Sequence, residues 1–149
     1  MANRVYSFLD IHASLVGPGV SISLGAGAGT ADEGISVDAS EEIDHMMIGS
    51  DGTPMHSLGA NKSGKVVVRL LKTSPSNAIL SAAYAFQTAS GLTHGQNTLT
   101  IANPVTGDVI TCQQVAFAKA PSIRYGKEGG IQEWEFNAGI IDRSLGAGI

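Results

Sequence analysis

The sequence is poor in cysteine and in long apolar runs, and each shortage excludes a class of protein. Its one cysteine, Cys112, cannot form a disulfide within the chain, which fits folding in a reducing compartment. Ser, Gly or charged residues interrupt every apolar run well before the roughly 18 residues of a transmembrane helix. Residues 1–4 lack the apolar stretch of a signal peptide. We therefore expect a cytoplasmic chain without membrane insertion.

Basic and aromatic residues are also scarce. Nine Lys and Arg face thirteen Asp and Glu, so the net charge of −4 disfavours tight binding to nucleic acid phosphates. One Trp and three Tyr leave few platforms on which a sugar or another small ligand could stack. A small-ligand- or carbohydrate-binding β-sandwich module therefore stays an alternative that the composition hardly supports.

Glycine, by contrast, is abundant, with 19 residues in a chain of 149. Such a composition favours many turns, and the length fits a single domain over residues 1–149. Alternating or β-branched stretches predict a mainly β chain. The expected strands cover residues 5–11, 20–24, 35–37, 42–48, 65–72, 98–102 and 131–141, and a further strand around 109–115 follows the turn at 103–108. Long glycine-rich loops are expected over residues 25–34 and 49–64.

One segment, at about residues 75–89, predicts an α-helix. Ser74 can cap its first turn, Pro75 fits the first helical position, and Gly91 can end it. Its apolar residues recur at helical spacing and predict a stripe that packs on the sheet. The residues expected in this packing are Ile79, Leu80, Ala83 and Phe86.

The last predicted strand and the second long loop suggest where the surfaces lie. A period of two places Trp134, Phe136, Ala138 and Ile140 on a core face and Glu133, Glu135 and Asn137 on a polar face. The loop at 49–64 is polar apart from Met55 and Leu58, so we expect these two to dock on a neighbour. A mobile surface loop is the plainer alternative.

Apparent chemical motifs have plainer explanations. Residues 59–66 match a phosphate-binding loop, but Val66 stands in place of the magnesium-binding Ser or Thr and a strand follows. The four histidines have no metal-ligand spacing, and Cys112 lies in a strand pattern. The acids have no evident catalytic partner. We expect no enzyme, catalytic residue, cofactor or metal site.

Three segments carry a resemblance to a known family. Residues 64–71, residues 72–84 and residues 130–139 resemble the tail tube protein of tailed bacteriophages. The resemblance implies an antiparallel β-sandwich or half-barrel with one flanking helix. It also implies hexameric rings that stack into a hollow conduit for the genome, with the tail sheath and the baseplate or tail terminator proteins as partners. The chain would then belong to the virion tail and be made and assembled in the host bacterial cytoplasm.

The resemblance also gives the acidic and loop residues expected roles. The lumen would be polar and acidic, so that DNA passes without specific binding, and its candidate residues are Glu133, Glu135, Glu42 and Asp44. Met55 and Leu58 would contact the next ring. A tube subunit of a phage-derived contractile injection or secretion system is the alternative within this class.

Overall fold

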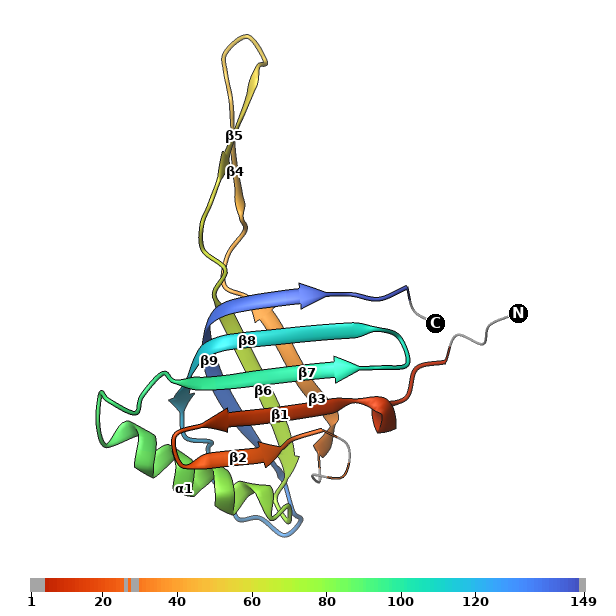
Figure 1. Ribbon diagram of the computed structural model, residues 1–149, viewed down its shortest axis with the longest axis vertical. Helices are drawn as coiled ribbons and strands as arrows, with labels where there is room; N and C mark the ends of the chain where they lie inside the picture. Colours follow the sequence, from red (N-terminus) through yellow and green to blue (C-terminus); the bar gives the residue numbers. More distant parts are fainter. Residues whose placement is uncertain (1–4, 26, 28–29, 148–149) are drawn as a thin grey trace.

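The computed structural model of the chain describes residues 5–25, 27 and 30–147. These residues form nine antiparallel strands, one short 3₁₀ helix and one α-helix (Figure 1). The elements are η1 (Phe8–Asp10), β1 (His12–Gly17), β2 (Val20–Ser23), β3 (Thr30–Ala39), β4 (Asp44–Ile48), β5 (Pro54–Leu58), β6 (Gly64–Leu71), α1 (Ser76–Thr88), β7 (Asn97–Asn103), β8 (Asp108–Lys119) and β9 (Ile131–Ser144). The mainly β prediction is confirmed.

Seven strands form one sheet in the order β2-β1-β7-β8-β9-β6-β3, and this sheet folds over on itself. Figure 1 shows β1, β2 and β7 in one layer and β3 and β6 crossing behind them, with the long strands β8 and β9 contributing to both. The two layers enclose the apolar core. This arrangement is the predicted sandwich or half-barrel with one helix beside it.

The fold-over occurs where Gln114 of β8 lies opposite Gly139 of β9. Gln114 has φ of +53°, the one non-glycine residue with positive φ in the described part of the chain. A Cβ at Gly139 would lie 3.1 Å from Cβ of Gln114, so the close approach favours glycine. At this corner the alternation of inward and outward residues along β9 is interrupted: Ala138 faces the core before it, and Ile141, not Ile140, packs against the core after it. The predicted core position Ile140 is therefore only half-buried.

An aromatic cluster occupies the centre of the core. The Phe117 ring lies 4.8 Å from that of Phe136, 6.0 Å from that of Trp134 and 5.6 Å from that of Tyr84. Aliphatic side chains from both layers surround it, among them the fully buried Leu15, Leu24, Leu70, Leu80, Leu99, Val66, Val68 and Val115. Burial of Trp134 and Phe136 confirms the predicted core face of β9.

The helix α1 packs on the sandwich with a stripe rotated from the predicted one. Leu80 and Ala83 are buried as expected, but Ile79 and Phe86 are 48% and 54% exposed in the subunit. The inward positions are instead Ser76, Leu80, Ala83 and Gln87. Phe86 lies beside Gly19, at the rim of the helix contact. Within the described residues no helix is long and apolar enough to cross a membrane.

A buried amide network explains this rotation. Nε2 of Gln87 donates to Oδ1 of Asn97 at 2.8 Å and to the Pro18 carbonyl at 3.0 Å. In return, Nδ2 of Asn97 donates to Oε1 of Gln87 at 2.6 Å and to the Val115 carbonyl at 3.0 Å. Both side chains are fully buried. Because a buried amide needs its partners, the network holds Gln87 inward and turns Phe86 toward solvent.

Truncation of this network has an expected cost. Asn97→Ala leaves the buried Gln87 amide short of partners, so we expect it to lower the free energy of unfolding by about 2 kcal/mol. Urea unfolding followed by circular dichroism measures the change. The matched control Gln96→Ala alters an exposed neighbour and should stay within ~0.5 kcal/mol. Equal effects of the two variants would contradict this account of the helix orientation.

Three predicted segment boundaries are wrong. Residues 5–11 hold η1 rather than a strand, because the Ser7 hydroxyl accepts from the Leu9 amide at 3.2 Å and starts a turn. β3 begins at Thr30, inside the predicted glycine-rich loop, whose residues 26, 28 and 29 lie outside the described ones. The predicted loop at 49–64 contains β5, which pairs with β4. Local composition hid both strands, because β3 depends on pairing with the distant β6 and β5 on pairing with β4 across the turn.

Candidate functional site

The strands β4 and β5 form a hairpin that projects from the body of the molecule (Figure 1). The two strands pair only with each other among the described strands, and every one of their residues is exposed. The arm therefore lacks the core packing of the other strands. An isolated two-stranded hairpin is only marginally stable in water, so contact with another molecule would stabilise it. It is therefore the candidate site for contact with another molecule.

Both faces of this arm carry apolar side chains. The cross-strand pair Met47 and Met55 lies on one face, and Met46, Ile48 and Leu58 lie on the other. Leu58 is 83% exposed and Met55 is 55% exposed. Exposed apolar surface of this extent, concentrated on one projecting element, marks an interaction site. The structure therefore places both predicted loop anchors, Met55 and Leu58, on the arm, together with three apolar residues that the sequence did not single out.

Acids occupy the two ends of the arm. At its tip the Thr53 amide donates to Oδ1 of Asp51 at 3.0 Å and holds the pKa of that carboxyl below its usual range. At its stem Asp44 contacts Nδ1 of His56 at 3.0 Å, and Glu41 accepts from the Asn61 amide at 3.1 Å. Glu42, also predicted to face a channel, is exposed between them.

The other two predicted channel acids lie on the outward face of β9, beside cations. Glu133 lies opposite Arg69 of β6, with Oε1 of Glu133 3.4 Å from Nε of Arg69. Glu135 has Lys65 at 3.7 Å and Lys119 at 4.0 Å. The sequence predicted the polar face of β9 but not the basic residues that lie beside it. Period-two spacing of Lys65 and Arg69 on β6 was the signal that could have found them.

The layer that carries these charges has two strand edges that no other described strand pairs with. The strand β3 ends the seven-stranded sheet and pairs only with β6 among the described strands. At the other side of the layer, residues 116–119 of β8 pair with β9 alone, because the pairing with β7 ends at Val115. Open edges of this kind can accept strands from neighbouring chains.

The sites of chemistry considered from the sequence have no counterpart in the described residues. Cys112 is fully buried, and burial raises the pKa of its thiol, as for a core side chain rather than a nucleophile. The segment after the apparent phosphate-binding loop is β6, so no helix N-terminus points at it. Residues 5–25, 27 and 30–147 hold no group of three or more His, Cys, Asp or Glu able to bind a metal ion.

Comparison with solved structures shows the same fold in tube-containing assemblies. A chain of the sheath-tube complex of an extracellular contractile injection system, PVC, aligns with a TM-score of 0.60 over 93% of this chain and 90% of that one, at 11% identity. A chain of the anti-feeding prophage baseplate gives a TM-score of 0.60 over 97% of both chains, at 11% identity. A chain from the tail of an empty GTA particle gives a TM-score of 0.60 over 96% of this chain and 100% of that one, at 15% identity.

These identities are low, so the structural likeness concerns the fold. No curated protein sequence matches the chain. The family model for the bacteriophage PhiTE tail tube protein, however, matches residues 2–146. Since that match covers almost the whole chain, including the arm, the charged face of β9 and both open edges, the chain belongs to the PhiTE tail tube protein family of bacteriophages.

Proposed function

We propose that the chain, as a single domain over residues 1–149, stacks as hexameric rings into the hollow tube of a phage tail. The observation that carries this proposal is the β4–β5 arm, whose apolar side chains are exposed in the described part of the subunit. Membership of a tail tube family supports the tube. The structurally similar chain from the GTA particle comes from a tail with C6 symmetry, which supports six copies in a ring. The role is structural, without catalysis or a cofactor.

Ring closure follows from the two open edges. A closed ring has no strand edges, so pairing β3 of one copy with residues 116–119 of the next copy removes both at once. The outward face of β3, β6 and β9 then lines the lumen. Stacking is a separate contact, in which the arm crosses to the adjacent ring and buries Met55 and Leu58 there.

The lumen wall in this arrangement is polar and contains charges of both signs. Glu133 pairs with Arg69, and Glu135 is shared by Lys65 and Lys119, so this cluster of two acids and three bases keeps a single excess positive charge and offers DNA few unpaired cations. Glu42 and Asp44 add negative charge at the arm stem, close to where two rings meet. Phosphates are therefore not held, and the genome passes without specific binding.

Reversing the two lumen acids should make the tube retain DNA. Glu133→Lys with Glu135→Lys places five cations on this face and removes both carboxylates of β9, so tubes assembled with linear DNA should protect it from nuclease at low salt. Protection should fall steeply as salt rises. Tubes of the wild type and of Asp10→Lys, a charge reversal on η1, should not protect DNA. Absence of protection by the double variant would contradict the lumen assignment.

A contractile injection system is the second candidate assembly. Its support is the likeness to chains of the PVC sheath-tube complex and the anti-feeding prophage baseplate. The same ring would then sit inside a sheath, on a baseplate and under a terminator, instead of in a virion tail. Capsid genes beside the gene for this chain would favour the phage, where the chain is made in the host bacterial cytoplasm.

Negative-stain microscopy of the purified protein at rising concentration tests the proposal directly. Rings of six copies and tubes built from them are the expected particles. Strictly monomeric protein under every solution condition would overturn the proposal. The assay needs no assumption about a ligand.

A further inference from the structure

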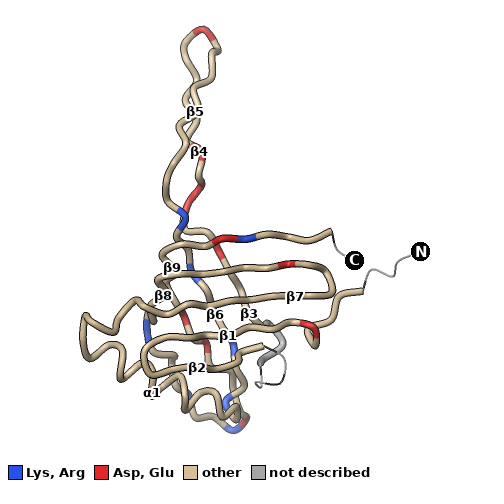
Figure 2. Tube along the Cα trace, in the orientation of Figure 1, with Lys and Arg blue, Asp and Glu red and all other residues tan. Residues whose placement is uncertain are grey.

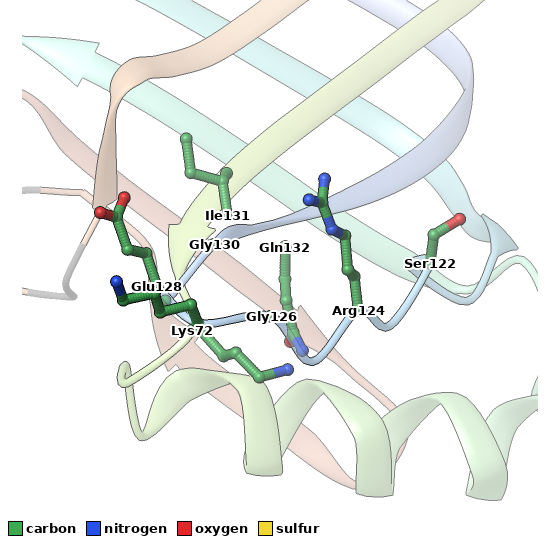
Figure 3. Close-up of a pocket in the computed structure, with 10 residues that line it drawn as sticks. Lys72, Ser122, Arg124, Gly126, Glu128, Gly130, Ile131 and Gln132 are labelled. Carbon is green, nitrogen blue, oxygen red and sulfur yellow. The ribbon is translucent and has the colours of Figure 1, made fainter.

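A cleft at the opposite end of the body from the arm has no role so far. It has a volume of about 480 Å³ and lies between the end of β6, the start of β9 and the segment that connects β8 to β9 (Figure 3). We propose that this cleft binds the acidic stem of the arm from a copy in the adjacent ring. This inference rests on the proposed assembly into a tube. The partner is thus a second copy of this chain.

Chain topology places the two surfaces at opposite ends. β3 enters the arm after Ala39 and β6 leaves it at Gly64, with these two residues paired. β6 then runs away from the arm to Leu71, which pairs with Ile131 at the far end. The cleft contains Lys72 and Ile131, so it lies one strand length from the arm. When copies stack head to tail, the arm end of one copy meets the cleft end of the next copy.

The cleft is basic. Lys72, Arg124 and Lys127 line it, and Glu128 is the one acid among its described lining residues. Lys72 places Nζ 4.2 Å from the centre of the Tyr125 ring. None of the three cations forms a salt bridge within the described residues. Figure 3 shows Lys72 entering from the end of β6 and Arg124 rising from the connecting segment, so both side chains are available to an incoming carboxylate.

The arm supplies the opposite charge. Residues 41–61 contain Glu41, Glu42, Asp44 and Asp51 and no Lys or Arg, although Lys62 follows at once. With thirteen acids and nine bases in the chain, these four acids equal its whole net charge of −4. Figure 2 shows acids on the stem and at the tip of the arm, with one basic segment at its base, and both cations and an acid at the far end of the body. Counting Lys62 beside the stem and Glu128 in the cleft, the stem has a net charge of −2 and the cleft a net charge of +2, so the two surfaces are complementary.

The length of the arm assigns the stem, rather than the tip, to the cleft. From Asp44 to Asp51 a strand spans roughly 25 Å, about the length of β6. When two rings abut, the stem lies at the joint, whereas the tip reaches far along the adjacent subunit. Glu41, Glu42 and Asp44 therefore meet the cleft, and the apolar part of the arm packs beyond it.

Charge reversal tests this pairing. Arg124→Glu with Lys127→Glu should raise the protein concentration needed for tube formation at least tenfold, because each of the six contacts per ring becomes repulsive. Glu41→Lys with Glu42→Lys should do the same. Combining all four substitutions in one chain should restore assembly to within about threefold of the wild type. Asp10→Lys, outside both surfaces, should assemble normally.

Cross-linking separates failure of this inference from failure of the tube. Chains with Glu42→Cys and with Lys127→Cys are mixed and treated with a short bis-maleimide, while the wild-type Cys112 is buried. A heterodimer that forms from the two variants, and from neither one alone, supports the contact. Tubes with no cross-link and no effect of charge reversal would overturn the inference but leave the tube standing. If the wild type forms no tubes, the tube proposal is wrong. In that case a cross-link between the two variants in concentrated protein still supports the contact between stem and cleft, and its absence overturns it.

DNA is the other polyanion that the cleft could hold. Duplex DNA binding that Arg124→Glu abolishes, in a variant that still forms tubes normally, would assign the cleft to DNA and overturn the inference. Because the proposed pairing is ionic and exposed, tube formation should also weaken between 0.15 M and about 1 M salt. Tubes that are indifferent to salt would contradict it.

Discussion

Replacing residues 44–58 with a two-residue Asn-Gly turn should give a folded subunit that forms no tubes. The Gly59 amide already donates to the Ile43 carbonyl at 2.7 Å, so the chain ends left by the deletion are adjacent and suit a tight hairpin turn. Every deleted residue is exposed, so the deletion removes no side chain from the apolar core. Stacking, in contrast, loses the whole apolar surface of the arm.

Electron microscopy and thermal unfolding together measure this result. We expect no tubes at concentrations at least a hundredfold above those that suffice for the wild type, because all six arms of each ring are lost. The melting temperature of the subunit should shift by no more than about 3 °C. Met55→Ser with Leu58→Ser should weaken stacking in the same direction, whereas Leu92→Ser, an equally exposed apolar residue on the body, should not. Tubes of normal length from the deletion variant would refute the role of the arm.

Phe136→Ala should cause the largest loss of stability of any single substitution in the core. Phe136 is fully buried, and its ring lies 4.8 Å from that of Phe117, at the centre of the aromatic cluster. The chain has only eight aromatic residues, so few large side chains can close the resulting cavity. Truncation of a buried Phe costs about 3–5 kcal/mol, which lowers the melting temperature of a chain of this size by roughly 10–15 °C.

Urea and thermal unfolding, followed by the near-ultraviolet signal of Trp134, measure this loss. Tyr125→Ala is the matched control, since Tyr125 is 83% exposed and its truncation should shift the melting temperature by less than about 2 °C. A loss below ~1 kcal/mol for Phe136→Ala would mean that the two layers repack around the cavity. The aromatic cluster would then not be the centre of the fold.

The candidate surfaces were predictable to different degrees. Alternation along β9 gave both its core residues and its outward acids, because a period of two needs no knowledge of the partner strand. The cations beside Glu133 and Glu135 depend on the register of β6 against β9 and could not be read from either strand alone. The basic cleft joins Lys72 to Arg124, which are far apart in the sequence, so only the fold brings them together.

The arm shows how composition can mislead about local structure. Gly, Pro and polar residues over 49–64 have the composition of a loop, and Met55 and Leu58 stood out only as isolated apolar residues. The structure contains a paired strand there, with register Met47 to Met55. A strand was expected at residues 42–48, but the composition of residues 54–58 did not indicate that they pair with it across the turn.

The strand-rich character of the chain, its one helix, the core face of β9 and the family resemblance could all be read from the amino-acid sequence. These features depend on local periodicity, on a capping Ser and Pro, and on short contiguous segments. The tertiary structure alone decided which side of α1 faces inward, because the Gln87 and Asn97 amides must satisfy one another in the core. Where the sheet folds over and which charges meet also depend on the tertiary fold, because both require residues distant in sequence to come into contact. The arm is left unpacked because the two-layer body closes its core without it.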